Sequence, residues 1–96
     1  MDVTLADRVT VHPSVLCREL GGETVLLHLE SGVYFGLDAV GTRAWNLLVQ
    51  ELTLAEVCAV MLDEFDVAAH VLQDDLTALV RDLCEKHLLV PGRSGA

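Results

Sequence analysis

The side chains best suited to chemistry in this 96-residue chain are three cysteines and four histidines. The nearest approach to a metal motif is Cys84-x-x-His87, whose two side chains would share one face of a helix. A structural zinc site needs a second pair of ligands, and no pair with matching spacing is present. We therefore expect no metal site, with Cys84 as a small core residue and His87 as a solvated one.

Catalysis has little support in the sequence. A Cys17–His28 dyad would require adjacent strands to align thiol and imidazole, and no third group that would orient the histidine is evident. The chain contains no G-x-S-x-G elbow, phosphate loop or dinucleotide-binding fingerprint. The expectation is a protein that is not an enzyme and carries no cofactor, although a small enzyme using Cys17 remains the weakest alternative.

The charge balance narrows the choice of partners. Six Lys and Arg against 15 Asp and Glu give a formal net charge of −9, which disfavours nucleic acid and anionic membranes. A peptide or protein partner fits better. The number of cysteines is odd and they are widely spaced, and the N-terminus lacks the basic and apolar regions of a signal peptide. These features predict a reducing, cytoplasmic location.

The first half of the chain is typical of a β-meander. Residues 1–7 are expected to form a loose tail. Strand-like runs follow at residues 8–12, 15–20, 23–30 and 33–37. Gly21-Gly22 and Ser31-Gly32 are tight-turn signals between the last three runs, so these runs are predicted to pair as a three-stranded antiparallel sheet.

The second half has helical spacing. Asp38 is a predicted N-cap for a first helix, with Val40, Ala44, Leu47 and Leu48 on its apolar face and Trp45 as a core anchor. Capping signals at Thr53 to Glu56 and at Asp66 predict a second helix to about residue 64 and a third over 68–87. Residues 88–90 are predicted to be extended, with a frayed tail from Pro91 onward.

The fold class that follows is α+β: a winged-helix-like arrangement in which a three-stranded antiparallel sheet is followed by three α-helices. We expect a single domain over residues 1–96 with an ordered core at about 8–90.

One ordered set of motifs resembles a known family. It consists of residues 22–45, GETVLLHLESGVYFGLDAVGTRAW, followed by Leu52-Thr53, Phe65-Asp66-Val67, the run from Asp75 to Leu83 and Leu88-Leu89. This set is similar to the PqqD-like precursor-peptide recognition elements over about residues 14–90. The Tyr34 to Asp38 segment looks closest to the small stand-alone members that accompany lasso-peptide leader peptidases.

The resemblance implies a peptide-binding groove. In this family a precursor leader peptide adds a strand to the edge of the third strand and lies against the third helix. Helical spacing assigns one flank of that helix to the groove. The predicted leader-binding residues are Val33, Tyr34, Phe35, Gly36 and Leu37 on the strand, with Val71, Asp75, Ala78, Leu79 and Asp82 on the helix.

The resemblance also implies partners. Besides the precursor leader peptide, these are a leader peptidase of the transglutaminase-like cysteine protease type and its cyclase, with the chain a monomer or weak homodimer. A PqqD-type chaperone for a radical-SAM enzyme is the alternative of the same class. A winged-helix DNA-binding regulator is the alternative of another class, but residues 54–64 contain no Lys or Arg.

Overall fold

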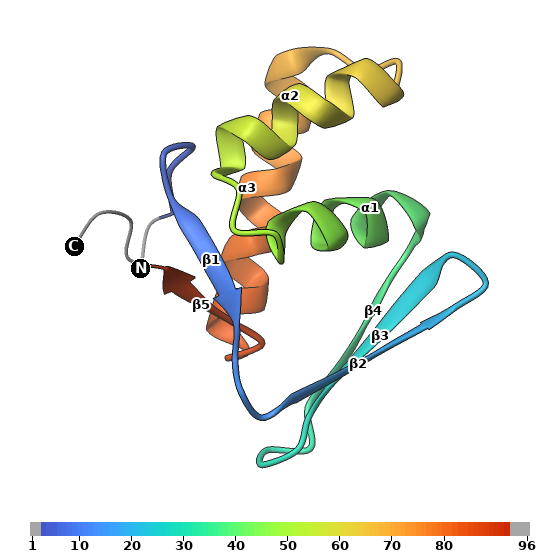
Figure 1. Cartoon of the computed structure of the whole chain (residues 1–96), viewed down its shortest axis with the longest axis vertical. Coiled ribbons are helices and arrows are strands. Elements are labelled where there is room, and N and C mark those ends of the chain that lie inside the picture. Colours follow the sequence, from blue (N-terminus) through green and yellow to red (C-terminus); the bar gives the residue numbers. More distant parts are fainter. Residues whose placement is uncertain (1–2, 93–96) are drawn as a thin grey trace.

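The computed structural model describes residues 3–92, which form five strands and three helices (Figure 1). Their order is β1 (Arg8–Val11), β2 (Val15–Leu20), β3 (Glu23–His28), β4 (Tyr34–Leu37), α1 (Ala39–Leu48), α2 (Leu54–Glu64), α3 (Ala69–Glu85) and β5 (Leu89–Gly92). No helix in this part of the chain is long and apolar enough to cross a membrane.

The predicted meander is confirmed. Strands β2, β3 and β4 form an antiparallel sheet in that order, and its register places Leu26 of β3 opposite Cys17 on one side and Phe35 on the other. Gly21 and Gly22 have φ values of +61° and +85°, as a tight turn between β2 and β3 requires. The α+β class with three helices after this sheet is therefore confirmed.

A second sheet was not anticipated. β1 and β5 pair antiparallel, with Thr10 opposite Val90 and Arg8 opposite Gly92. The prediction of a frayed tail from Pro91 onward is therefore wrong for Pro91 and Gly92, while residues 93–96 lie outside the described part. Proline is compatible with this position because an edge strand has amides that need no partner in the sheet.

The N-terminal segment also departs from expectation. Val3 is buried, and the carbonyl oxygens of Asp7 and Leu5 accept the backbone N–H groups of Leu54 and Ala55 at 3.0 and 2.8 Å. The first amides of a helix have no partner within it, so these carbonyls satisfy the start of α2. The prediction of a loose tail is wrong for residues 3–7, while residues 1–2 lie outside the described part.

Two of the three predicted helix caps are confirmed. The Asp38 carboxylate accepts the Gly41 N–H at 2.8 Å. Thr53 and Glu56 form the reciprocal capping box, with bonds of 3.1 and 2.8 Å. Asp66, in contrast, caps nothing: Val67 and Ala68 stay outside the helix, and α3 begins at Ala69 without a side-chain cap. The predicted cap at Asp66 is therefore wrong.

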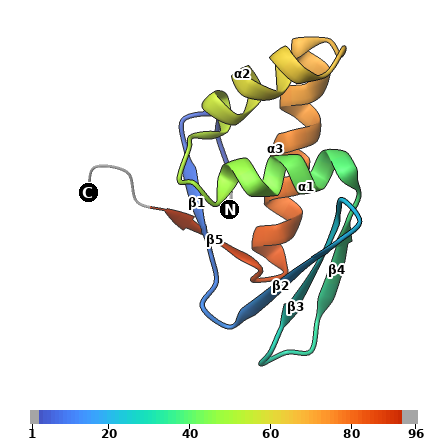
Figure 2. The same cartoon turned by 45° about the vertical axis from the view of Figure 1, so that its right-hand side comes forward.

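The core lies between the helices and one face of the meander (Figures 1 and 2). Leu26, Trp45 and Leu48 are buried there, which confirms Trp45 as a core anchor. Val40 was expected on the buried face of α1, yet 46% of its surface is exposed. It lies in the first turn of α1, where it lines a groove beside β4.

Candidate functional site

The edge of β4 is the structural feature that the site is built on. β4 pairs with β3 on one side, and no strand among residues 3–92 pairs with its other side. A strand edge of this kind presents backbone donors and acceptors to any chain that approaches in an extended conformation.

The register identifies the groups that this edge presents. The His28 N–H donates to the Val33 carbonyl at 2.8 Å, and the Leu29 N–H donates to the Ser14 carbonyl on the β2 side, also at 2.8 Å. Backbone direction alternates along antiparallel strands. Because Val25 therefore faces β2, its partner Gly36 turns its N–H and C=O away from β3, and Tyr34 does the same.

A groove of about 430 Å³ lies beside this edge. Three elements enclose it: β4, the first turns of α1 and the middle of α3. Its lining residues are Phe35, Gly36, Leu37, Asp38, Val40, Gly41, Ala44, Leu72, Asp75, Leu76 and Leu79. An extended guest on the β4 edge would thus have a largely apolar trough for its side chains on the helix side.

The groove has an apolar floor and an acidic rim. Leu37, Leu72 and Leu76 are buried and form the floor. Asp75 is exposed on the rim, and no side-chain bond engages it among the described residues. No lysine or arginine is among the lining residues. The groove therefore favours an apolar guest side chain with a basic or hydroxyl-bearing neighbour.

Near the C-terminal end of α3, Lys86 contacts both Phe35 and Asp82. The Lys86 ammonium lies 5.4 Å from the centre of the Phe35 ring, a cation–π distance, and 2.6 Å from a carboxylate oxygen of Asp82. Because Asp82 forms this i, i+4 ion pair with Lys86, its carboxylate already has a partner within the chain.

Half of the predicted site residues line the groove, and half do not. Those that line it are Phe35, Gly36, Leu37, Asp75 and Leu79. Val33 precedes β4 and Tyr34 begins it; both side chains are exposed, with 74% of Tyr34 exposed, and neither lines the groove. Val71 and Ala78 are exposed outside the groove lining, and Asp82 pairs with Lys86.

The sequence interpretation missed the contribution of α1. Asp38, Val40, Gly41 and Ala44 form one wall, and Leu72 and Leu76 complete the floor. The i, i+4 spacing of Val40 and Ala44 predicts a core-facing stripe and does not by itself indicate a groove wall. Only the placement of α1 against β4 shows that the stripe is shared between core and groove.

The thiols do not form a catalytic arrangement. The register places Val15 opposite His28 and Cys17 opposite Leu26, so the strands do not pair Cys17 with His28 as the dyad would require. Burial raises the pKa of the Cys58 and Cys84 thiols above the ordinary value, which keeps them protonated at neutral pH.

Comparison with known proteins agrees with this geometry. The family model described as coenzyme PQQ synthesis protein D (PqqD) matches residues 23–89. A solved complex of TbiB1 with the TbiA(beta) leader peptide superposes with a TM-score of 0.79 at 36% identity, covering 91% of this chain and 96% of that one.

A second solved complex is similar in fold. It is described as lasso peptide synthetase B1 with the leader peptide, and it superposes with a TM-score of 0.81 at 24% identity, covering 88% of this chain and 99% of that one. No match was found among proteins of curated function.

Proposed function

The chain belongs to the PqqD family, and from this premise we propose that it is a non-catalytic adaptor that captures the leader segment of a precursor peptide. The observation that carries the proposal is the unpaired edge of β4 beside an apolar groove. The 36%-identical relative forms a complex with a leader peptide, and this chain has the surface that such a guest needs.

The proposed mode of binding is strand addition. The outward N–H and C=O groups of Tyr34 and Gly36 would pair with the backbone of the leader. Alternate leader side chains would enter the groove over Leu37 and Leu76, which supplies specificity. A few buried side chains with several backbone bonds correspond to a free energy of about −8 to −10 kcal/mol, a micromolar to sub-micromolar Kd.

The proposed biological setting is lasso-peptide biosynthesis in the cytoplasm. There the chain would present the bound leader to a separate leader peptidase of the transglutaminase-like cysteine protease type, with a cyclase acting afterwards. Both structural neighbours are complexes with leader peptides, and the second is described as a lasso peptide synthetase component.

The test introduces a charged side chain into the apolar wall of the groove. Val40 lines the groove with 46% of its surface exposed, so Val40→Glu and Val40→Lys should leave the fold intact. Each places a charge where the leader buries apolar surface, so both should weaken binding at least about tenfold. The measurement is fluorescence anisotropy with a labelled TbiA(beta) leader peptide, the guest in the complex of the 36%-identical relative.

Val49 supplies the matched control, because it is a valine of similar exposure, 41%, directly after α1 and outside the groove. Val49→Glu and Val49→Lys should bind as the unmodified chain does. Unchanged affinity in both Val40 variants, with folding verified by circular dichroism, would contradict the groove assignment.

A second candidate is favoured by the description of the matching family model, which names coenzyme PQQ synthesis. In that case the same groove would serve a radical-SAM enzyme. The neighbouring genes discriminate between the two: a peptidase and a cyclase support the first, and a radical-SAM enzyme supports the second.

A further inference from the structure

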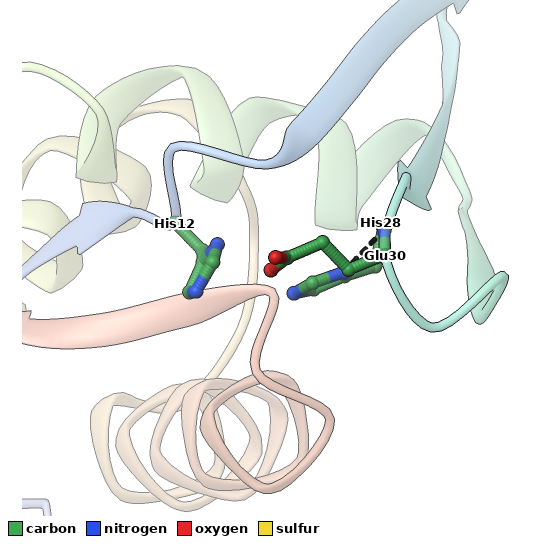
Figure 3. A group of neighbouring side chains, drawn as sticks. All are labelled: His12, His28 and Glu30. Carbon is green, nitrogen blue, oxygen red and sulfur yellow. Dashed lines mark hydrogen bonds between the residues drawn. The ribbon is translucent and has the colours of Figure 1, made fainter.

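Three side chains outside the groove converge at the corner between the two sheets. His12 directly follows β1, His28 ends β3, and Glu30 lies in the turn that leads toward β4. One potential ligand atom from each lies within 4.8 Å of the others (Figure 3). Within residues 3–92 this is the only group of at least three such side chains that lie this close.

The backbone holds both imidazole rings in place. The His12 Nδ1 accepts the Ser14 N–H at 3.0 Å, and the His28 Nδ1 accepts the N–H groups of Glu30 and Ser31 at 3.3 and 3.4 Å. The ring centres are 4.6 Å apart with a 43° tilt. Each ring therefore accepts at Nδ1 and carries its proton on Nε2, so a cation that binds at Nε2 must displace this proton to Nδ1 and break these bonds.

The surroundings give a cation access and a favourable field. His28 is only 4% exposed, His12 is partly exposed, and Glu30 is exposed on the turn. The chain carries a net charge of −9. A cation can thus approach past Glu30, while the buried ring supplies a fixed ligand on the inner side.

We propose that His12, His28 and Glu30 bind one zinc-type divalent cation through the two Nε2 atoms and the Glu30 carboxylate. Two imidazoles with one carboxylate suit zinc, with water completing the coordination shell. Magnesium and calcium prefer sets made entirely of oxygen ligands, so they bind this cluster poorly.

Coordination changes the hydrogen bonds that anchor the rings. A neutral ring whose Nδ1 accepts an N–H carries its proton on Nε2. The cation takes the Nε2 lone pair, so the proton moves to Nδ1 and the ring stays neutral. The amides of Ser14, Glu30 and Ser31 then lose their acceptor, and the turn must adjust.

The test is a calorimetric titration with zinc chloride on the full chain carrying Cys17→Ser, which removes the one exposed thiol. We expect one ion per chain. His12→Asn keeps an acceptor near the position of Nδ1 but removes Nε2, and Glu30→Gln removes the carboxylate charge. Each should weaken zinc affinity at least about tenfold.

Two controls separate this cluster from other histidines. His70 is exposed on α3, and His87 is the partner in the Cys84-x-x-His87 motif. His70→Asn and His87→Asn should leave zinc affinity unchanged, and magnesium chloride should give no heat. In amide NMR spectra, zinc should shift the Ser14, Glu30 and Ser31 signals first.

Two results would overturn the proposal. One is the absence of saturable zinc binding at micromolar concentrations. The other is binding that survives both His12→Asn and Glu30→Gln, or that His87→Asn abolishes, because the ion would then lie elsewhere.

Discussion

Proline at position 36 would remove one backbone donor from the proposed binding edge without touching the rest of the sheet. The Gly36 N–H points away from β3, so its loss breaks no bond between β3 and β4. Gly36 has extended backbone rather than a positive φ, and a Cβ built there meets nothing within 4 Å. Proline is tolerated on edge strands for the same reason.

The size of the effect follows from the bond that is lost. A guest carbonyl left without its donor in a partly buried interface costs about 1–3 kcal/mol. At about 1.4 kcal/mol per tenfold, Gly36→Pro should raise the Kd for the leader about 5- to 150-fold. The melting temperature should stay close to that of the unmodified chain, because the β3–β4 bonds remain.

Gly36→Ala is the matched control, because it adds a side-chain carbon but keeps the N–H. Exposed substitutions of this kind change free energies by about 0.5 kcal/mol, so its Kd should stay within about threefold. Anisotropy titrations with the labelled leader measure both variants. Equal, unchanged affinity for Gly36→Pro would refute strand addition at this amide, and equal loss in both variants would point to steric crowding instead.

Two further predictions concern stability. Thr53→Ala removes the side-chain acceptor of the capping box at the start of α2, and should lower the free energy of unfolding in urea by about 0.5–2 kcal/mol. The Arg43 guanidinium, bonded to Glu64 at 2.8 and 2.6 Å, lowers the pKa of that carboxyl. The pair therefore stabilises the fold above the unfolded-state pKa of Glu64, and this stabilisation is lost as pH falls through the lower folded-state pKa. In Glu64→Gln, the free energy of unfolding measured in urea should therefore fall less steeply as the pH drops below about 5. A pH dependence equal to that of the unmodified chain would contradict this prediction.

Local signals in the sequence were sufficient for the elements they control. Paired glycines at 21 and 22 fix a tight turn because other residues rarely adopt positive φ. The Thr53–Glu56 box fixes a helix start because both partners lie within one turn of chain. Such rules act over a few residues and need no knowledge of the rest of the fold.

Contacts between distant segments were not predictable in the same way. β1 and β5 lie near opposite ends of the chain and pair with each other. The sequence of a short strand does not specify which distant strand it pairs with. The same limit applies to the groove, because the α1 wall at Val40 exists only once α1 is placed against β4. His12 and His28 are 16 residues apart and only the fold brings them together. No motif spacing marks them as neighbours.

Within residues 3–92 the meander has two unpaired edges, and a physical difference between them explains why one of them would be selective. β2 ends the sheet on the other side, and its residues from Leu16 to Leu20 are all exposed, whereas the groove lies on the β4 side. A peptide pairing there would gain backbone bonds, each of which contributes little once exchange with water is counted. At β4 the same bonds come with apolar side-chain burial against α1 and α3, and burial supplies most of the free energy. Sequence preference should therefore reside in the guest residues that reach the groove, and a polar guest should bind neither edge.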